Sequence, residues 1–136
     1  MLTAGLKAEA RMTVTADMLV PGVTGVFGDF SAMPPVLATM YLVGFLEETA
    51  IKCVLPHQEA GQHSLGTDIS VTHIAPTPEG MEIRAEAELV AVEGRSLRFH
   101  VRAWDAAGLI SEGTHRRATI DVARFNAKVA AKSAAT

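Results

Sequence analysis

Residues 36–54 read VLATMYLVGFLEETAIKCV and follow two consecutive prolines, Pro34 and Pro35. Proline is tolerated in a first helical turn because the N–H group that it lacks would have no partner there. Apolar residues occupy nearly every face of a helix drawn through this stretch, and a helix that is apolar all round is a buried helix. The stretch therefore predicts one long central helix from Val36 to about Val54, which ends near Pro56.

The remaining chain is patterned for strands. Residues 8–20 are rich in Thr and Val and predict one strand before the helix, whereas residues 21–30 carry three glycines and predict an irregular segment. After the helix, the period-two alternation of half-buried strands recurs in four segments joined by short turns: 65–73, 83–89, 97–103 and 109–122. Hairpin-connected strands form an antiparallel sheet, and the single apolar helix must cover one face of it. The predicted class is α+β, with an antiparallel five-stranded sheet wrapped around one long central helix, which is the layout of a hot-dog fold.

Length and composition predict one domain. The chain has 136 residues, of which 49% are hydrophobic, so residues 1–136 are expected to form a single unit with a sizeable core. The Ala- and Lys-rich residues 127–136 predict a loose C-terminal tail. One helix on one small sheet leaves sheet edges and apolar surface uncovered, and we therefore expect a homodimer.

The charge balance and the cysteine count argue against several partners and sites. The net charge of -3 is unlike that of a general nucleic-acid or anionic-membrane binder, which needs a basic patch. The longest apolar run, residues 40–46, is shorter than the roughly 20 residues that span a bilayer, and the N-terminus lacks a secretion signal. Cys53 is the single cysteine, so no internal disulfide or multi-thiolate zinc site can form. We expect a cytoplasmic protein without metal, membrane or nucleic-acid contacts.

Two adjacent acids, Glu47 and Glu48, lie inside the most apolar segment. Burial of a carboxylate is costly unless it is paired. Thr39, Val43 and Glu47 share one side of the helix, so Glu47 is the candidate that points inward; the alternative is that both acids line an exposed edge. Thr39 and Glu47 are roughly 12 Å apart in a regular helix, too far for a hydrogen bond, but they can flank an elongated group such as a thioester.

Histidines and arginines supply the other candidates. His73 follows Ile69 and Val71 on one strand face and is either a core residue or a general base, because histidine titrates near neutrality. Arg116 and Arg117 can meet a phosphate, although their pattern favours a solvated face. His115 is ambiguous, and Cys53 is expected in the core. No P-loop, Rossmann or Gly-x-Ser-x-Gly motif appears, so no nucleotide cofactor is expected.

The order and spacing of several blocks resemble the fluoroacetyl-CoA thioesterase group of hot-dog enzymes. The resemblance covers most of the chain from about Val36 to Val129 and rests on six blocks: Thr39–Glu47, Ser64–Thr67, Val71–His73, Val92–Arg95, Gly113–His115 and Phe125–Val129. It implies an acyl-CoA thioesterase that hydrolyses a small acyl-CoA to the free acid and CoA without a cofactor. The family's catalytic set corresponds to Thr39, Glu47 and His73.

The resemblance also implies substrate contacts. Gly66 matches a family glycine near the thioester, so its N–H is the expected oxyanion donor. Independently of the resemblance, Arg117 is expected to bind the substrate, because an arginine can meet a phosphate. The family's phenylalanine-rich lid corresponds to the segment with Phe30 and Met33, where methionine replaces the second aromatic residue. This departure affects fluorine selectivity and not hydrolysis. The alternative function is a non-catalytic hot-dog protein that binds an acyl-CoA or a small hydrophobic ligand; the acid–histidine helix motif of a hot-dog dehydratase is missing.

Overall fold

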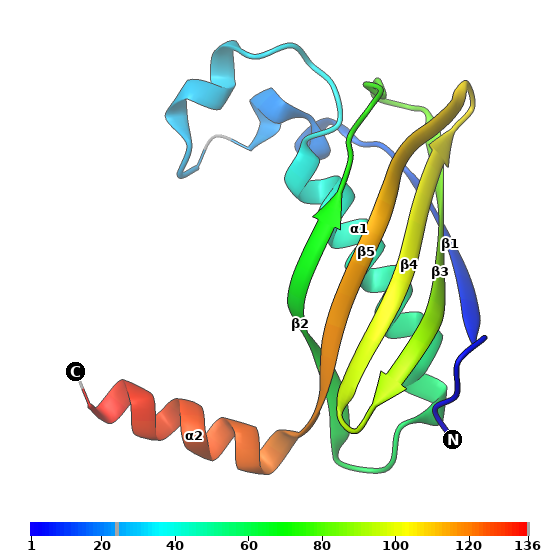
Figure 1. Ribbon diagram of the computed structural model, residues 1–136. Helices are drawn as coiled ribbons and strands as arrows, with labels where there is room; N and C mark the ends of the chain where they lie inside the picture. Colours follow the sequence, from blue (N-terminus) through cyan, green and yellow to red (C-terminus); the bar gives the residue numbers. More distant parts are fainter. Residues whose placement is uncertain (24, 136) are drawn as a thin grey trace.

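A five-stranded antiparallel sheet curls around helix α1, Thr39–Val54, in the computed structural model, which describes residues 1–23 and 25–135 (Figure 1). The spatial order of the strands is β1-β3-β4-β5-β2, and every neighbouring pair is antiparallel. The strands are β1 Lys7–Thr13, β2 Gln62–Val71, β3 Glu82–Glu93, β4 Ser96–Asp105 and β5 Gly108–Asp121. The predicted α+β hot-dog architecture is confirmed.

Helix α1 begins at Thr39 and not at Val36. Val36 and Leu37 remain extended and bridge to Pro78 and Leu19, because their backbone groups are used elsewhere. The Val20 N–H donates to the Val36 carbonyl at 2.9 Å, and the Leu37 N–H donates to the Thr77 carbonyl at 2.8 Å. At its other end α1 stops at Val54, where a 3-10 turn that contains Pro56 follows, as predicted.

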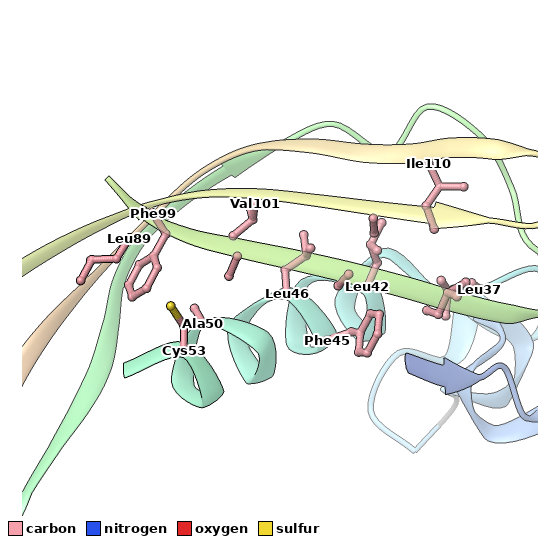
Figure 2. Packing of buried hydrophobic residues seen from close by; sticks show 14 of the residues in the cluster. Leu37, Leu42, Phe45, Leu46, Ala50, Cys53, Leu89, Phe99, Val101 and Ile110 are labelled. Carbon is pink, nitrogen blue, oxygen red and sulfur yellow. The ribbon is translucent and has the colours of Figure 1, made fainter. Parts of the chain in front are cut away.

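The core lies between α1 and the concave face of the sheet (Figure 2). Leu42, Leu46 and Ala50 are fully buried on the side of α1 that faces the sheet. Their partners are the inward residues of β3, β4 and β5, among them Ile83, Leu89, Phe99, Val101 and Ile110. The expectation that α1 is buried all round is wrong, because Met40 is 46% and Tyr41 is 38% exposed on its outer side.

The N-terminal strand is shorter than predicted. β1 ends at Thr13 because its partner β3 begins opposite, at Glu82. Beyond Thr13 the chain forms 3-10 turns at Ala16–Met18 and Val20–Gly22 instead of continuing as a strand to residue 20. The segment that was predicted to be irregular, 21–30, includes the start of a further 3-10 turn, Gly28–Ala32; Thr24 lies outside the described residues.

A second helix, α2 (Val122–Ala134), replaces the loose tail predicted for residues 127–136, of which Thr136 lies outside the described residues. The Asp121 carboxylate caps this helix by accepting the Arg124 N–H at 2.9 Å, and the Ala- and Lys-rich composition favours helix. Figure 1 shows α2 standing away from the sheet, at the end of β5. Over the described ranges, no helix is long and apolar enough to cross a membrane.

Candidate active site

Thr39 and His73 form the first polar contact along α1. Thr39 is the first residue of α1, and His73 follows the end of β2 by two residues. Their side chains meet with 2.8 Å between Thr39 Oγ1 and His73 Nδ1. Burial lowers the pKa of His73, which favours its neutral form. A hydroxyl on a neutral imidazole is an arrangement suited to proton transfer.

The His73 ring has an unused nitrogen. Its Nε2 atom is buried and has no hydrogen-bond partner among residues 1–23 and 25–135. Buried polar atoms are normally paired, so this ring nitrogen calls for a partner from outside the described chain, such as a water or a bound molecule. The interpretation of His73 as an ordinary core histidine is therefore disfavoured.

Glu47, two turns farther along α1, belongs to a second cluster that is built around the guanidinium of Arg117. Arg117 Nη1 donates to Glu47 Oε1 at 3.2 Å. Its Nε donates to the Ser64 hydroxyl and its Nη2 to the Ser64 carbonyl, both at 2.8 Å. The Arg117 side chain is only 3% exposed, so the solvated face predicted for this residue is wrong. Burial lowers the pKa of Arg117, and the Glu47 carboxylate opposes this shift.

His115 completes the second cluster. Its Nε2 lies 3.1 Å from Arg117 Nη1 and its Nδ1 lies 2.8 Å from the Asp68 carbonyl oxygen. A guanidinium only donates, so Nε2 must accept, and Nδ1 must carry the hydrogen that is donated to Asp68. Burial is the main cause that lowers the pKa of His115, and this neutral tautomer agrees with that direction.

Gly66 provides the space that Glu47 occupies. A Cβ atom at Gly66 would lie 2.5 Å from Glu47 Oε1 and 3.3 Å from His115 Cε1. The register of β2 against β5 shifts between Gly66 and Asp68, so Thr67 is an inserted residue. The bulge moves Ser64 and Gly66 onto the helix side and leaves Leu65 exposed. The continuous face predicted from Leu65 through Thr67 to Ile69 is therefore wrong.

The predicted site residues thus fall into three places. The structure joins Thr39 to His73 and joins Glu47 to Gly66 and Arg117. The two clusters lie along the same helix, with Thr39 and Glu47 roughly 12 Å apart. The two predicted lid residues lie in the segment before α1, where the Phe30 ring packs at a tilt of 34° against Phe27 with a centroid distance of 5.3 Å and Met33 is exposed.

Strand alternation could have revealed Arg117 and His115. His115, Arg117 and Thr119 share one face of β5, and all three are buried, whereas Arg116 between them is exposed. Side chains of adjacent residues on a strand point to opposite faces, so Arg116 and Arg117 cannot both be solvated on one face.

The sequence predicted no metal site. In the described part of the chain no three His, Cys, Asp or Glu side chains form a group that could hold a metal ion.

A five-stranded curled sheet around one central helix defines the fold as that of the hot-dog proteins. A hot-dog-like protein from Thermanaerovibrio acidaminovorans has the same fold, with a TM-score of 0.82 at 17% identity over 96% of this chain and 93% of that one. The profile of the family described as fluoroacetyl-CoA-specific thioesterase matches residues 14–123. The chain belongs to this family.

Individual relatives agree with the family assignment. A fluoroacetyl-CoA thioesterase from Streptantibioticus cattleyicolor is 45% identical over 107 residues, which span 79% of this chain and 77% of that protein. A threonine-to-serine variant of the fluoroacetyl-CoA thioesterase, solved with acetyl-CoA, has a TM-score of 0.93 at 37% identity and covers 96% of this chain and 98% of that one.

The close approach at Gly66 generates a stability prediction. Gly66→Ala places a methyl group against the Glu47 carboxylate that Arg117 holds, and we expect it to destabilise the fold by about 1–3 kcal/mol. Gly44→Ala is the matched control, because a Cβ there has no neighbour within 4 Å and alanine in a helix stabilises by about 0.5–1 kcal/mol. Chemical denaturation measures both; equal effects of the two substitutions would contradict the packing described here.

Proposed function

We propose that this protein is an acyl-CoA thioesterase that hydrolyses a small acyl-CoA to the free acid and CoA. The observation that carries the proposal is the hydrogen bond between Thr39 and His73, 2.8 Å long, in a chain of the thioesterase family. A pocket that only binds an acyl-CoA has no need for a neutral imidazole with one free ring nitrogen beside an engaged hydroxyl.

In the proposed reaction, Thr39, Glu47 and His73 are the catalytic residues. In the direct route water attacks the acyl carbon with Glu47 as an assisting base, His73 accepts the water proton, the C–S bond breaks, and His73 returns that proton to the CoA sulfur. In the alternative route a Glu47 oxygen attacks the acyl carbon, the C–S bond breaks to release CoA, and water then cleaves the acyl-glutamate to the free acid and Glu47. The Gly66 N–H is the proposed oxyanion donor, and Arg117 keeps the Glu47 carboxylate in place. Intact mass spectrometry of a His73→Ala variant with a slow thioester separates the two routes, since only the nucleophilic route leaves an adduct.

Thiol release from acyl-CoA substrates tests the function. With acetyl-, fluoroacetyl-, longer and aromatic acyl-CoAs as the panel, Glu47→Gln should lower kcat roughly 10²–10⁴-fold on the best substrate, because a positioned catalytic carboxylate is lost. Glu48→Gln is the matched control, since Glu48 is exposed and makes no ion pair in the described part of the chain. Thermal stabilisation by acyl-CoA without thiol release would instead identify a non-catalytic binding protein.

The acyl preference of the enzyme depends on the lid segment. Phe30 and Met33 are proposed substrate-binding residues, and Met33 stands where fluorine-selective members carry an aromatic ring. Methionine is flexible and tolerates varied shapes. We therefore propose that fluoroacetyl-CoA is hydrolysed without strong discrimination against acetyl-CoA, and the same substrate panel measures this ratio.

The lowered pKa of His73 generates a prediction about pH. Only the neutral imidazole accepts a proton, and burial favours that form, so kcat/KM should stay high as the pH falls to 6.5 and should decline below that pH. His115 also has a lowered pKa, so it could cause the same decline at low pH. A His115→Gln variant should therefore show the same decline in kcat/KM at low pH, the acid limb of the profile, if His73 is its cause. An acid limb centred above pH 6.5 in the unmodified protein would contradict the assignment.

We also propose a homodimer that associates through the β2 edge. The two edges of the sheet differ, because β1 carries Lys7, Glu9 and Arg11, whereas β2 has Asp68 as its single Asp, Glu, Lys or Arg residue. Charged side chains protect a free edge from pairing, and β2 lacks that protection. Apolar side chains near this edge are exposed, among them Leu65 and Ile74.

Sedimentation equilibrium tests the association. Leu65→Lys adds a charge beside the β2 edge and should weaken the dimer about tenfold or more, since an edge lysine opposes strand pairing. Leu55→Lys is the control at a leucine of similar exposure, 44% against 38% for Leu65. A monomeric protein at micromolar concentration, or equal effects of both substitutions, would exclude this interface.

A reducing, cytoplasmic setting is proposed for the protein. Cys53 is buried in the core, and burial raises the pKa of its thiol, so the thiol is a poor nucleophile. Such a cysteine serves packing and has no role in the proposed reaction.

Residues 1–136 are proposed to act as one domain.

A further inference from the structure

Unpaired cations gather at one end of the sheet. Arg95, Arg124 and Lys128 line a recess of about 240 Å³ between the β3–β4 turn, the end of β5 and helix α2. Within the described ranges, none of these three side chains lies within 4.0 Å of a carboxylate, whereas Lys7, Arg11, Arg84, Arg102 and Arg117 each do. The one acid in the recess, Asp121, accepts the N–H that caps α2. The recess therefore has an excess of positive charge in a protein whose net charge is -3.

A further pair of arginines, Arg98 and Arg116, lines a separate depression together with Glu93. Arg98 on β4 lies directly opposite Arg116 on β5, and like charges in this position destabilise a sheet. The other opposed pair, Arg11 and Arg84, is offset by ion pairs to neighbouring glutamates. Arg98 and Arg116 have no such ion pair in the part of the chain that the structure describes. Arg116 also lies opposite Asp68 on β2, so this pair has an acid beside it. The cations that indicate a ligand with negative charge are therefore Arg95, Arg124 and Lys128, which line the recess itself.

The recess continues the strand pair that carries the Glu47 cluster. Gln62, which lines the recess, precedes Gly66 by four residues on β2, a distance of roughly 13 Å along a strand. On β5, Thr119 lies two residues from Arg117 and also lines the recess. The Thr119 N–H donates to the Arg95 carbonyl at 2.8 Å, which fixes the β3–β4 turn beside β5.

We infer that this recess binds the phosphate groups of CoA, an inference that rests on the proposed function. CoA carries its thioester at one end of the pantetheine arm and a pyrophosphate and a 3′-phosphate at the other. An extended pantetheine arm can reach from Gly66 to the recess. Arginine forks match phosphate oxygens, and lysine adds a point charge. The half-buried ring of Phe125 lines the same recess and offers an apolar surface to the adenine base.

Calorimetric titration tests the inference without relying on turnover. The triple variant Arg95→Gln, Arg124→Gln, Lys128→Gln should bind CoA and 3′,5′-ADP about tenfold more weakly or worse than the unmodified protein, because charge-assisted phosphate contacts are lost. Pantetheine, which has no phosphate, should bind both proteins equally. Glutamine is a good helix former, so α2 is retained in the variant.

A second triple variant controls for net charge. Lys7→Gln, Arg11→Gln, Lys52→Gln removes the same charge from β1 and α1, and its affinity for CoA should match that of the unmodified protein. In turnover, the recess variant should show a raised KM for acyl-CoA with kcat within about twofold. Equal CoA and 3′,5′-ADP affinities of the two triple variants would overturn the inference. Absence of thiol release with intact 3′,5′-ADP binding would instead refute the proposed function and leave the recess supported.

Discussion

The buried guanidinium of Arg117 is the interaction on which the site depends. It connects three elements, because it lies on β5, donates twice to Ser64 on β2 and once to Glu47 on α1. Loss of the Ser64 or Glu47 contacts would leave a buried guanidinium without full compensation, which destabilises the fold. The Glu47 side chain is partly exposed, so the buried Arg117 guanidinium holds an accessible carboxylate. The carboxylate is thereby fixed in position while one side of it remains exposed to solvent.

Helix α1 has three sides with different surroundings, and two of them carry apolar residues. One side, with Leu42 and Leu46, packs on the sheet. A second side presents Thr39 and Glu47 toward the polar residues of β2 and β5. The outer side carries exposed Tyr41, and in sequence this side is indistinguishable from the core side. This outer side lies beside Met12 of β1, at the sheet edge opposite β2, so it is separate from the β2 edge that is proposed for association.

The sequence was sufficient for the fold because alternation and helical periodicity are local signals. It predicted the number of strands, the central helix and its end near Pro56. It did not predict the bulge at Thr67, because one inserted residue leaves the alternation on either side intact and only reverses its phase. It also missed the pairing of Arg117 with Glu47, because the two residues are 70 positions apart in the sequence and no local pattern connects them. Helix α2 was missed because its alanine-rich composition also fits a disordered tail.

Polar features follow one line along the strand pair of β2 and β5. The Thr39–His73 contact lies at one end, the Glu47 cluster in the middle, and the cationic recess at the end where α2 begins. Such a line suits a long substrate whose reactive group and charged group are far apart. Contacts to the remote charged group supply binding energy equally before and during the reaction, so a small acyl group needs few contacts of its own for affinity. Under the proposed function, this division makes a methionine at position 33 of the proposed lid compatible with Thr39, Glu47 and His73 as the proposed catalytic residues.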